Sequence, residues 1–174
     1  SAEELRKDAE STKTEGEQKL SHLRRDGPLE TRPYSFLLVD SLRDNLPTQE
    51  SRASTIEAAL TAAAESLDRA KATYDQREAE RRRAKEAVEK NSDPTKAGES
   101  ANQLKGAELE AKVARQTVSL RQAELINAKS MQQVHDIHLT LLQEMLALME
   151  TDVVFSEDDL DSVLVAIQKQ EHEL

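Results

Sequence analysis

The stretch Asn91-Ser92-Asp93-Pro94 decides the fold, because it is the strong turn signal between two long segments with a helical pattern. The segment before it contains no glycine or proline from Thr48 to Lys90. The segment after it, as far as Asp152, is interrupted only by Gly98 and Gly106. Glycine and proline are the residues that most often end a helix, so each segment is predicted to form one long helix.

Two helices joined by a short turn lie antiparallel, and we therefore predict a helical hairpin with arms over about 48–91 and 94–151. Within the turn, the side chain of Ser92 or Asp93 can accept a hydrogen bond from the first N–H groups of the second arm. Pro94 then takes the first helical position, where its missing N–H group is harmless.

The first arm has a heptad pattern, in which the residues facing the partner helix recur at alternating spacings of four and three. These residues are Ile56, Leu60, Ala63, Leu67, Ala70, Tyr74, Arg77, Arg81, Ala84 and Val88. Alanine at alternate positions requires the partner helix to approach closely. Because Arg77 and Arg81 replace apolar residues, we expect weaker packing near the turn.

The second arm follows a similar period, and its C-terminal third is the most apolar. Its inward residues are predicted to be Leu104, Ala107, Ala111, Val118, Leu125, Ala128, Gln132, His135, Leu139, Leu142, Met145 and Met149. The large side chains therefore gather at the end of the hairpin opposite the turn. We expect Leu142→Ala or Met145→Ala to cost about 2–5 kcal/mol, and truncation of Val88 to cost less.

Outside the hairpin, residues 1–33 are predicted to form a weakly helical segment and a connector, with Gly27-Pro28 ending the helical part. Residues 34–174 are predicted to form the hairpin domain. Within it, Tyr34 to Leu46 is expected to be a short helix that Pro47 ends or kinks, because proline lacks the N–H group that a continuous helix needs.

A C-terminal helix is predicted over about 157–172 from its start signals. Ser156 is placed to be the N-cap, and Asp159, three residues later, completes a pair resembling a capping box. Phe155 and Leu160 have the spacing of a hydrophobic staple. We expect the apolar face of this helix to be buried against the helix over 34–46 and the apolar end of the hairpin. The fold class is thus all-α: an elongated, coiled-coil-like antiparallel hairpin on a small helical-bundle base.

The composition excludes several functions. The 174 residues carry a net charge of −10, which disfavours binding to nucleic acids or anionic lipids. The chain has no cysteine, so disulfides, zinc–thiolate sites and thiol catalysis are excluded. A basic cluster is interleaved with glutamates and is predicted to be a solvated helix face with ion pairs; its members are Arg77, Arg81, Arg82, Arg83 and Lys85.

Two groups of residues were considered as metal sites. His135 and His138 are three residues apart, but neither has a glutamate three residues before it, so we expect one ring to pack between helices and the other to meet solvent. An acidic group lacks the glycine and spacing of a calcium loop and is better explained by helix capping; it comprises Asp152, Glu157, Asp158, Asp159 and Asp161. We predict no catalytic, cofactor-binding or metal-binding residues, and a non-enzymatic protein.

The sequence has no signal-peptide pattern and no apolar run of about 18 residues. The helical pattern continues to Leu174, so we expect the chain to be a piece of a longer protein. Partners are expected to bind through helix packing.

Four segments together resemble the periplasmic, coiled-coil-rich N-terminal region of the large bacterial mechanosensitive channels of the MscS superfamily. They are Tyr34-Ser35-Phe36-Leu37-Leu38-Val39-Asp40-Ser41-Leu42, Arg81-Arg82-Arg83-Ala84-Lys85-Glu86, Val118-Ser119-Leu120-Arg121-Gln122-Ala123-Glu124-Leu125 and Asp152-Val153-Val154-Phe155-Ser156-Glu157-Asp158-Asp159-Leu160.

The resemblance implies a periplasmic domain of an inner-membrane channel that takes part in the response to osmotic stress. It also implies contacts with other subunits or envelope components, while the membrane would be reached only through a downstream part. Two alternatives are a periplasmic adaptor, whose hairpin docks to an outer-membrane channel, and a cytoplasmic coiled-coil scaffold. The sequence after Leu174 discriminates between them, because only the channel requires several apolar spans there.

Overall fold

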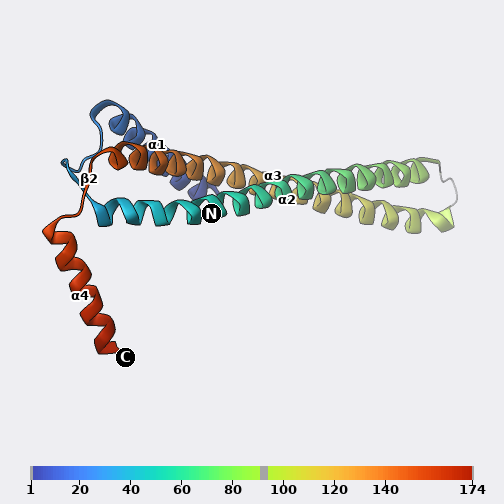
Figure 1. Ribbon diagram of the computed structural model, residues 1–174. Coiled ribbons are helices and arrows are strands. Elements are labelled where there is room, and N and C mark those ends of the chain that lie inside the picture. Colours follow the sequence, from blue (N-terminus) through green and yellow to red (C-terminus); the bar gives the residue numbers. More distant parts are fainter. Residues whose placement is uncertain (1, 91–93, 174) are drawn as a thin grey trace. The chain divides into compact units, whose positions relative to one another are not determined.

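The computed structural model describes residues 2–90 and 94–173 (Figure 1). Its elements are α1 (Ala2–Asp26), β1 (Tyr34–Ser35), α2 (Phe36–Lys90), α3 (Pro94–Met149), the 3-10 helix η1 (Glu150–Asp152), β2 (Val153–Val154) and α4 (Glu157–Glu173). The all-α prediction is confirmed. The predicted turn and cap at Asn91–Asp93 lie outside the described residues, and Pro94 is the first residue of α3.

The chain divides into two compact units. The first unit comprises residues 3–56 and 130–174, and therefore holds α1, the beginning of α2, the end of α3, and α4. The second unit comprises residues 57–129, which are the remaining parts of α2 and α3. Among the described residues, the largest fully buried side chains, Met149 and Val39, lie in the first unit, which agrees with the predicted apolar end of the hairpin.

The core of the first unit forms where α2 begins and α3 ends. Tyr34, Val39, Leu146 and Met149 are buried together there, with partly buried apolar residues packed around them. β1 and β2 pair in parallel beside this core, with Tyr34 opposite Val153. This two-residue pairing was not predicted, because two residues are too few to show an alternating pattern.

α1 is a complete helix rather than the weak one predicted, and its packing on α3 explains this. Leu23 is buried, and the Arg24 guanidinium binds Glu144 of α3 with an Nη2–Oε1 distance of 2.6 Å. The helix ends where predicted: Gly27 has a φ of 83° and donates its N–H to the Leu23 carbonyl at 2.9 Å. This is the left-handed C-terminal cap that glycine adopts without strain.

At Gly16, α1 lies very close to α3. A Cβ atom at this position would lie 2.8 Å from Cγ2 of Ile137, a methyl group on a stiff, β-branched side chain. A Cβ atom at Gly106 of the second unit, by contrast, would meet nothing within 4 Å. The absence of a side chain is therefore needed at Gly16 and not at Gly106.

We expect Gly16→Ala to destabilise the protein and Gly106→Ala to stabilise it. Both changes gain about 1 kcal/mol of helix propensity, but only Gly16→Ala adds an overpacking cost of about 1–3 kcal/mol. Urea unfolding of the two variants should show free energies that differ by that cost. Equal stabilisation by both alanines would contradict the close packing of α1 on α3.

Pro47 was predicted to end or kink the helix, and the predicted end is wrong, because α2 continues through Pro47 from Phe36 to Lys90. Proline removes one helical hydrogen bond. Leu42 and Leu46, just before the proline, pack against the core of the first unit. Tertiary packing of this kind outweighs local preference.

The expected burial of the C-terminal helix is also wrong. α4 extends away from the rest of the first unit (Figure 1), and Leu160, Leu164 and Ile167 are each about half exposed. Phe155 lies beside Phe36, with ring centroids 5.9 Å apart, rather than in a buried staple with Leu160.

The second unit is a pair of helices with small residues between them. Leu67 and Ala70 of α2 are buried, as are Ala111 and Ala114 of α3. Every residue predicted to face inward along α2, from Ile56 to Val88, is buried or half-buried. The heptad prediction is therefore confirmed, including the close approach that its alanines require.

Candidate functional site

The two histidines considered as metal ligands have different surroundings. His135 is buried, and its Nε2 lies 2.9 Å from the Gln49 carbonyl oxygen, which can only accept a hydrogen bond. His138 is exposed. In the described residues, no group of three or more histidine or acidic side chains is arranged to hold a metal. His135 thus links α3 to α2 as a structural residue.

The basic cluster of α2 is largely engaged in ion pairs, as predicted. Arg77 Nη1 lies 2.7 Å from Glu80 and 2.9 Å from Glu110 of α3, and Arg81 Nη2 lies 2.6 Å from Glu78. The contact with Glu110 joins the two helices of the second unit. These arginines therefore act within the hairpin rather than as a free basic surface.

Asp159 is the buried acidic residue of the group that was considered for calcium. Its carboxylate accepts hydrogen bonds from the Ser35 hydroxyl and from the Ser156 N–H at 2.8 Å, while its own N–H donates to Ser156 Oγ at 3.1 Å. These bonds confirm the predicted cap and attach the start of α4 to β1. The bond from Ser35, followed by that from the Ser156 backbone, lowers the pKa of Asp159 from 3.8 to about 2.

We expect the attachment of α4 to weaken in acid. Because the folded pKa of Asp159 lies below its usual value, the ionised carboxylate stabilises the junction above about pH 4, and this contribution is lost as the pH falls through about 2. An NMR titration should give a pKa near 2 in the wild type, and Ser35→Ala should raise it towards 3.8. A wild-type value near 3.8 would show that the bond from Ser35 does not form.

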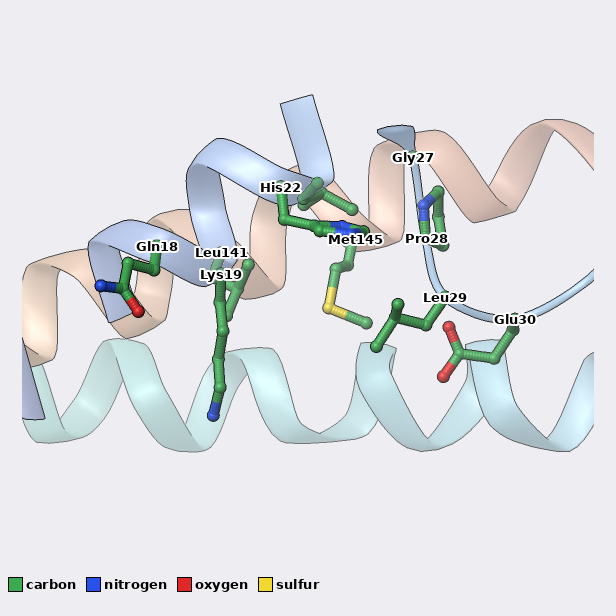
Figure 2. A pocket seen from close by; sticks show the side chains of 10 residues that line it. Gln18, Lys19, His22, Gly27, Pro28, Leu29, Glu30, Leu141 and Met145 are labelled. Atoms are coloured by element: carbon green, nitrogen blue, oxygen red, sulfur yellow. The ribbon is translucent and has the colours of Figure 1, made fainter. Parts of the chain in front are cut away.

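An apolar cavity of about 360 Å³ lies in the first unit between α1, the connector after it and α3. Figure 2 shows Met145 of α3 and Leu29 of the connector pointing towards each other, with Gln18 and Lys19 at one end of the lining and Glu30 at the other. The accessible surface of the lining is mostly apolar, although four of the lining residues are polar or charged: Gln18, Lys19, His22 and Glu30. It can receive an apolar group, and its arrangement provides no nucleophile paired with a base.

A first groove, also in the first unit, runs along α2 and α3 beneath α1. Its lining from the two long helices comprises Gln49, Arg52, Ile56, Met131, Val134, His135 and His138. Ala9 and Thr12 of α1 complete the lining. In this unit, therefore, α1 is the third helix that covers the pair.

A second groove, in the second unit, lies between α2 and α3. Its volume is about 360 Å³, close to the 350 Å³ of the first groove. Its lining comprises Ala70, Thr73, Arg77, Leu109, Glu110, Val113, Ala114 and Thr117. Leu109, Val113 and Leu120 form an apolar stripe on α3, with 56–64% of each residue exposed. Within residues 57–129, where only α2 and α3 occur, no third helix covers this groove.

α4 presents a second exposed apolar surface. Leu160, Leu164 and Ile167 recur at spacings of four and three, which places them on one face of the helix. The acidic residues Glu157 and Asp161 lie beside that face. This surface was predicted from the sequence, but its exposure was not.

The second groove, too, was not predicted from the sequence. Leu109, Val113 and Leu120 lie outside the predicted inward positions of the second arm, and an apolar residue at an outward position is the signal that could have revealed the groove. Single exposed apolar residues are common, so the signal lies in their sharing one helix face.

Comparisons with protein-family models, with curated proteins and with solved structures found no match to the chain. Among the helices of the described residues, none combines the length and the apolar character needed to cross a membrane.

Proposed function

We propose that the chain is a non-enzymatic helical interaction module, and that its second groove binds a helix. The observation that carries the proposal is the exposed stripe of Leu109, Val113 and Leu120 beside a groove of about 360 Å³. An amphipathic helix binds such a groove through apolar residues spaced three, four and seven apart. The net charge of −10 favours a protein partner over a nucleic acid.

The buried polar residues support a structural role. His135 and Asp159 are the buried polar or charged side chains among the described residues, and each is engaged in hydrogen bonds within the fold. Groups held in this way organise helix contacts. A catalytic group, by contrast, needs access to a substrate.

The wider setting that we propose is the periplasmic region of a mechanosensitive channel of the MscS superfamily. The support is the resemblance of four segments, above all Asp152–Leu160, whose cap attaches α4 to the start of α2. In this setting the module binds neighbouring subunits or envelope components by helix packing. Its part in osmotic-stress response is then to organise the channel, whose pore lies elsewhere.

The test is survival after a sudden fall in osmolarity, in cells that lack their own mechanosensitive channels. Cells that express the protein containing these residues should survive, and the variant Val113→Glu should reduce survival because it places a charge in the second groove. Leu29→Glu is the control, because Leu29 is likewise an exposed apolar residue but lies outside that groove. Absence of protection by the wild-type protein, when expressed at the membrane, would refute the channel assignment.

A further inference from the structure

The first and second grooves are built from the same heptad positions. On α2, Gln49, Arg52 and Ile56 of the first groove each lie 21 residues before Ala70, Thr73 and Arg77 of the second. On α3, the four residues Met131, Val134, His135 and His138 each lie 21 residues after Glu110, Val113, Ala114 and Thr117. Twenty-one residues are three heptads, so both grooves use the same faces of the two helices.

Because the two grooves use equivalent faces of α2 and α3, we expect a helix to pack over each of them. In the first unit α1 lies against the groove, which its Ala9 and Thr12 help to line. At Gly16, α1 packs on α3 so closely that there is no room for a side chain. In the second unit, Leu109 and Val113 stay more than half exposed beside the equivalent groove. The second groove therefore has the geometry of a helix-binding site and lacks its helix.

α4 has the apolar pattern that this groove requires. Its exposed residues Leu160, Leu164 and Ile167 match the spacing by which amphipathic helices bind grooves. The Asp159 cap fixes the start of the helix without burying this face. One chain thus exposes both a groove and a helix that suits it.

The charges beside the two surfaces are complementary. Lys105 and Lys112 border Leu109 in a shallow hollow that Glu108 also lines. Among the described residues neither lysine forms an ion pair. On α4, Glu157 and Asp161 lie beside the apolar face. Opposite charges at the rim of an apolar contact favour this pairing over one between two acidic helices.

We propose that α4 of a second copy of this chain packs along the second groove, as α1 packs along the first. The inference rests on the proposed role as an interaction module and names its partner. Leu160, Leu164 and Ile167 pack along Leu109, Val113 and Leu120, while Glu157 and Asp161 face Lys105 and Lys112.

Disulfide cross-linking tests this pairing without interference, because the chain has no cysteine. Val113→Cys and Leu164→Cys are made as separate variants, mixed in equal amounts and oxidised. A heterodimer should form in much higher yield than in the control mixtures. Ser119→Cys replaces Val113→Cys in one control and Ser162→Cys replaces Leu164→Cys in the other, since both serines are exposed but lie outside the apolar faces.

The charge contact has its own test. Lys112→Glu should lower the yield of the Val113–Leu164 disulfide, and Asp161→Lys in the partner should restore it. Equal yields in the control mixtures would overturn the proposal. So would a disulfide between two copies of the Val113→Cys variant as the main product.

The cross-linking experiment and the osmotic-shock survival test can fail independently of each other. If the disulfide fails to form but Val113→Glu still reduces survival, the groove binds a different helix and only the present inference falls. If the disulfide forms but cells gain no protection, the inference holds and the channel assignment falls.

Discussion

Replacing Met149 with alanine is expected to lower the free energy of unfolding by about 2–5 kcal/mol. Met149 has 0% of its surface exposed and lies in the core with Tyr34, Val39 and Leu146. Removing its thioether loses the burial of apolar atoms and leaves a cavity that these neighbours can fill only in part. Urea unfolding followed by circular dichroism measures the loss.

Met131 provides a matched control, because it is the same residue type on the same helix but 61% exposed. Met131→Ala should change the free energy of unfolding by less than about 0.5 kcal/mol. Losses of similar size in the two variants would mean that the junction of α2 and α3 in the first unit is not the main core.

Replacing Leu23 with alanine is expected to cost about 2–5 kcal/mol and to loosen α1. Leu23 is 5% exposed and precedes Arg24, whose pair with Glu144 is exposed and therefore contributes little. The packing of α1 thus depends mainly on Leu23 and on the close contact at Gly16. Hydrogen exchange of the α1 amides should accelerate in the variant.

Leu29 lines the same cavity but is 84% exposed, and it serves as the control for Leu23. Leu29→Ala should leave both unfolding and α1 exchange nearly unchanged. If Leu23→Ala left α1 exchange at the wild-type rate, α1 would be held by contacts other than those at Leu23.

The heptad positions of the long helices could be predicted because they depend on a repeating pattern. Alanine at positions such as Ala70 and Ala111 indicated close helices, and both residues are buried. The cap at Ser156 and Asp159 was predictable for a similar reason, since it needs only two residues at a fixed spacing. Its bond from Ser35 was not, because the partner is distant in the sequence.

Pro47 and α1 show where local rules fail. A proline signals a helix end, yet α2 continues because the packing of Leu42 and Leu46 on the first-unit core outweighs the lost bond. α1 has a thin apolar pattern and a glycine, both of which predict a weak helix. Gly16 instead permits the approach to Ile137, a contact that only the tertiary structure reveals.

The second groove shows a different limit of prediction from the sequence. Heptad analysis assigns Leu109 and Val113 to outward positions, where apolar residues have no role in a two-helix hairpin. The role that we propose for them rests on comparison with the first groove, where Val134, three heptads after Val113, lies in a groove that a third helix also lines. The sequence contained the repeat, but the structure was needed to show that a third helix lines the first groove and that, among the described residues of the second unit, none lines the second.

Sedimentation equilibrium of the purified chain tests the central claim, that the second groove binds α4 of another copy, most directly. The wild type should self-associate as its concentration rises, and Val113→Glu and Leu164→Glu should each raise the dissociation constant at least about tenfold. Leu29→Glu should leave it unchanged. A wild type that stays monomeric at all concentrations, or equal weakening by all three variants, would contradict the account.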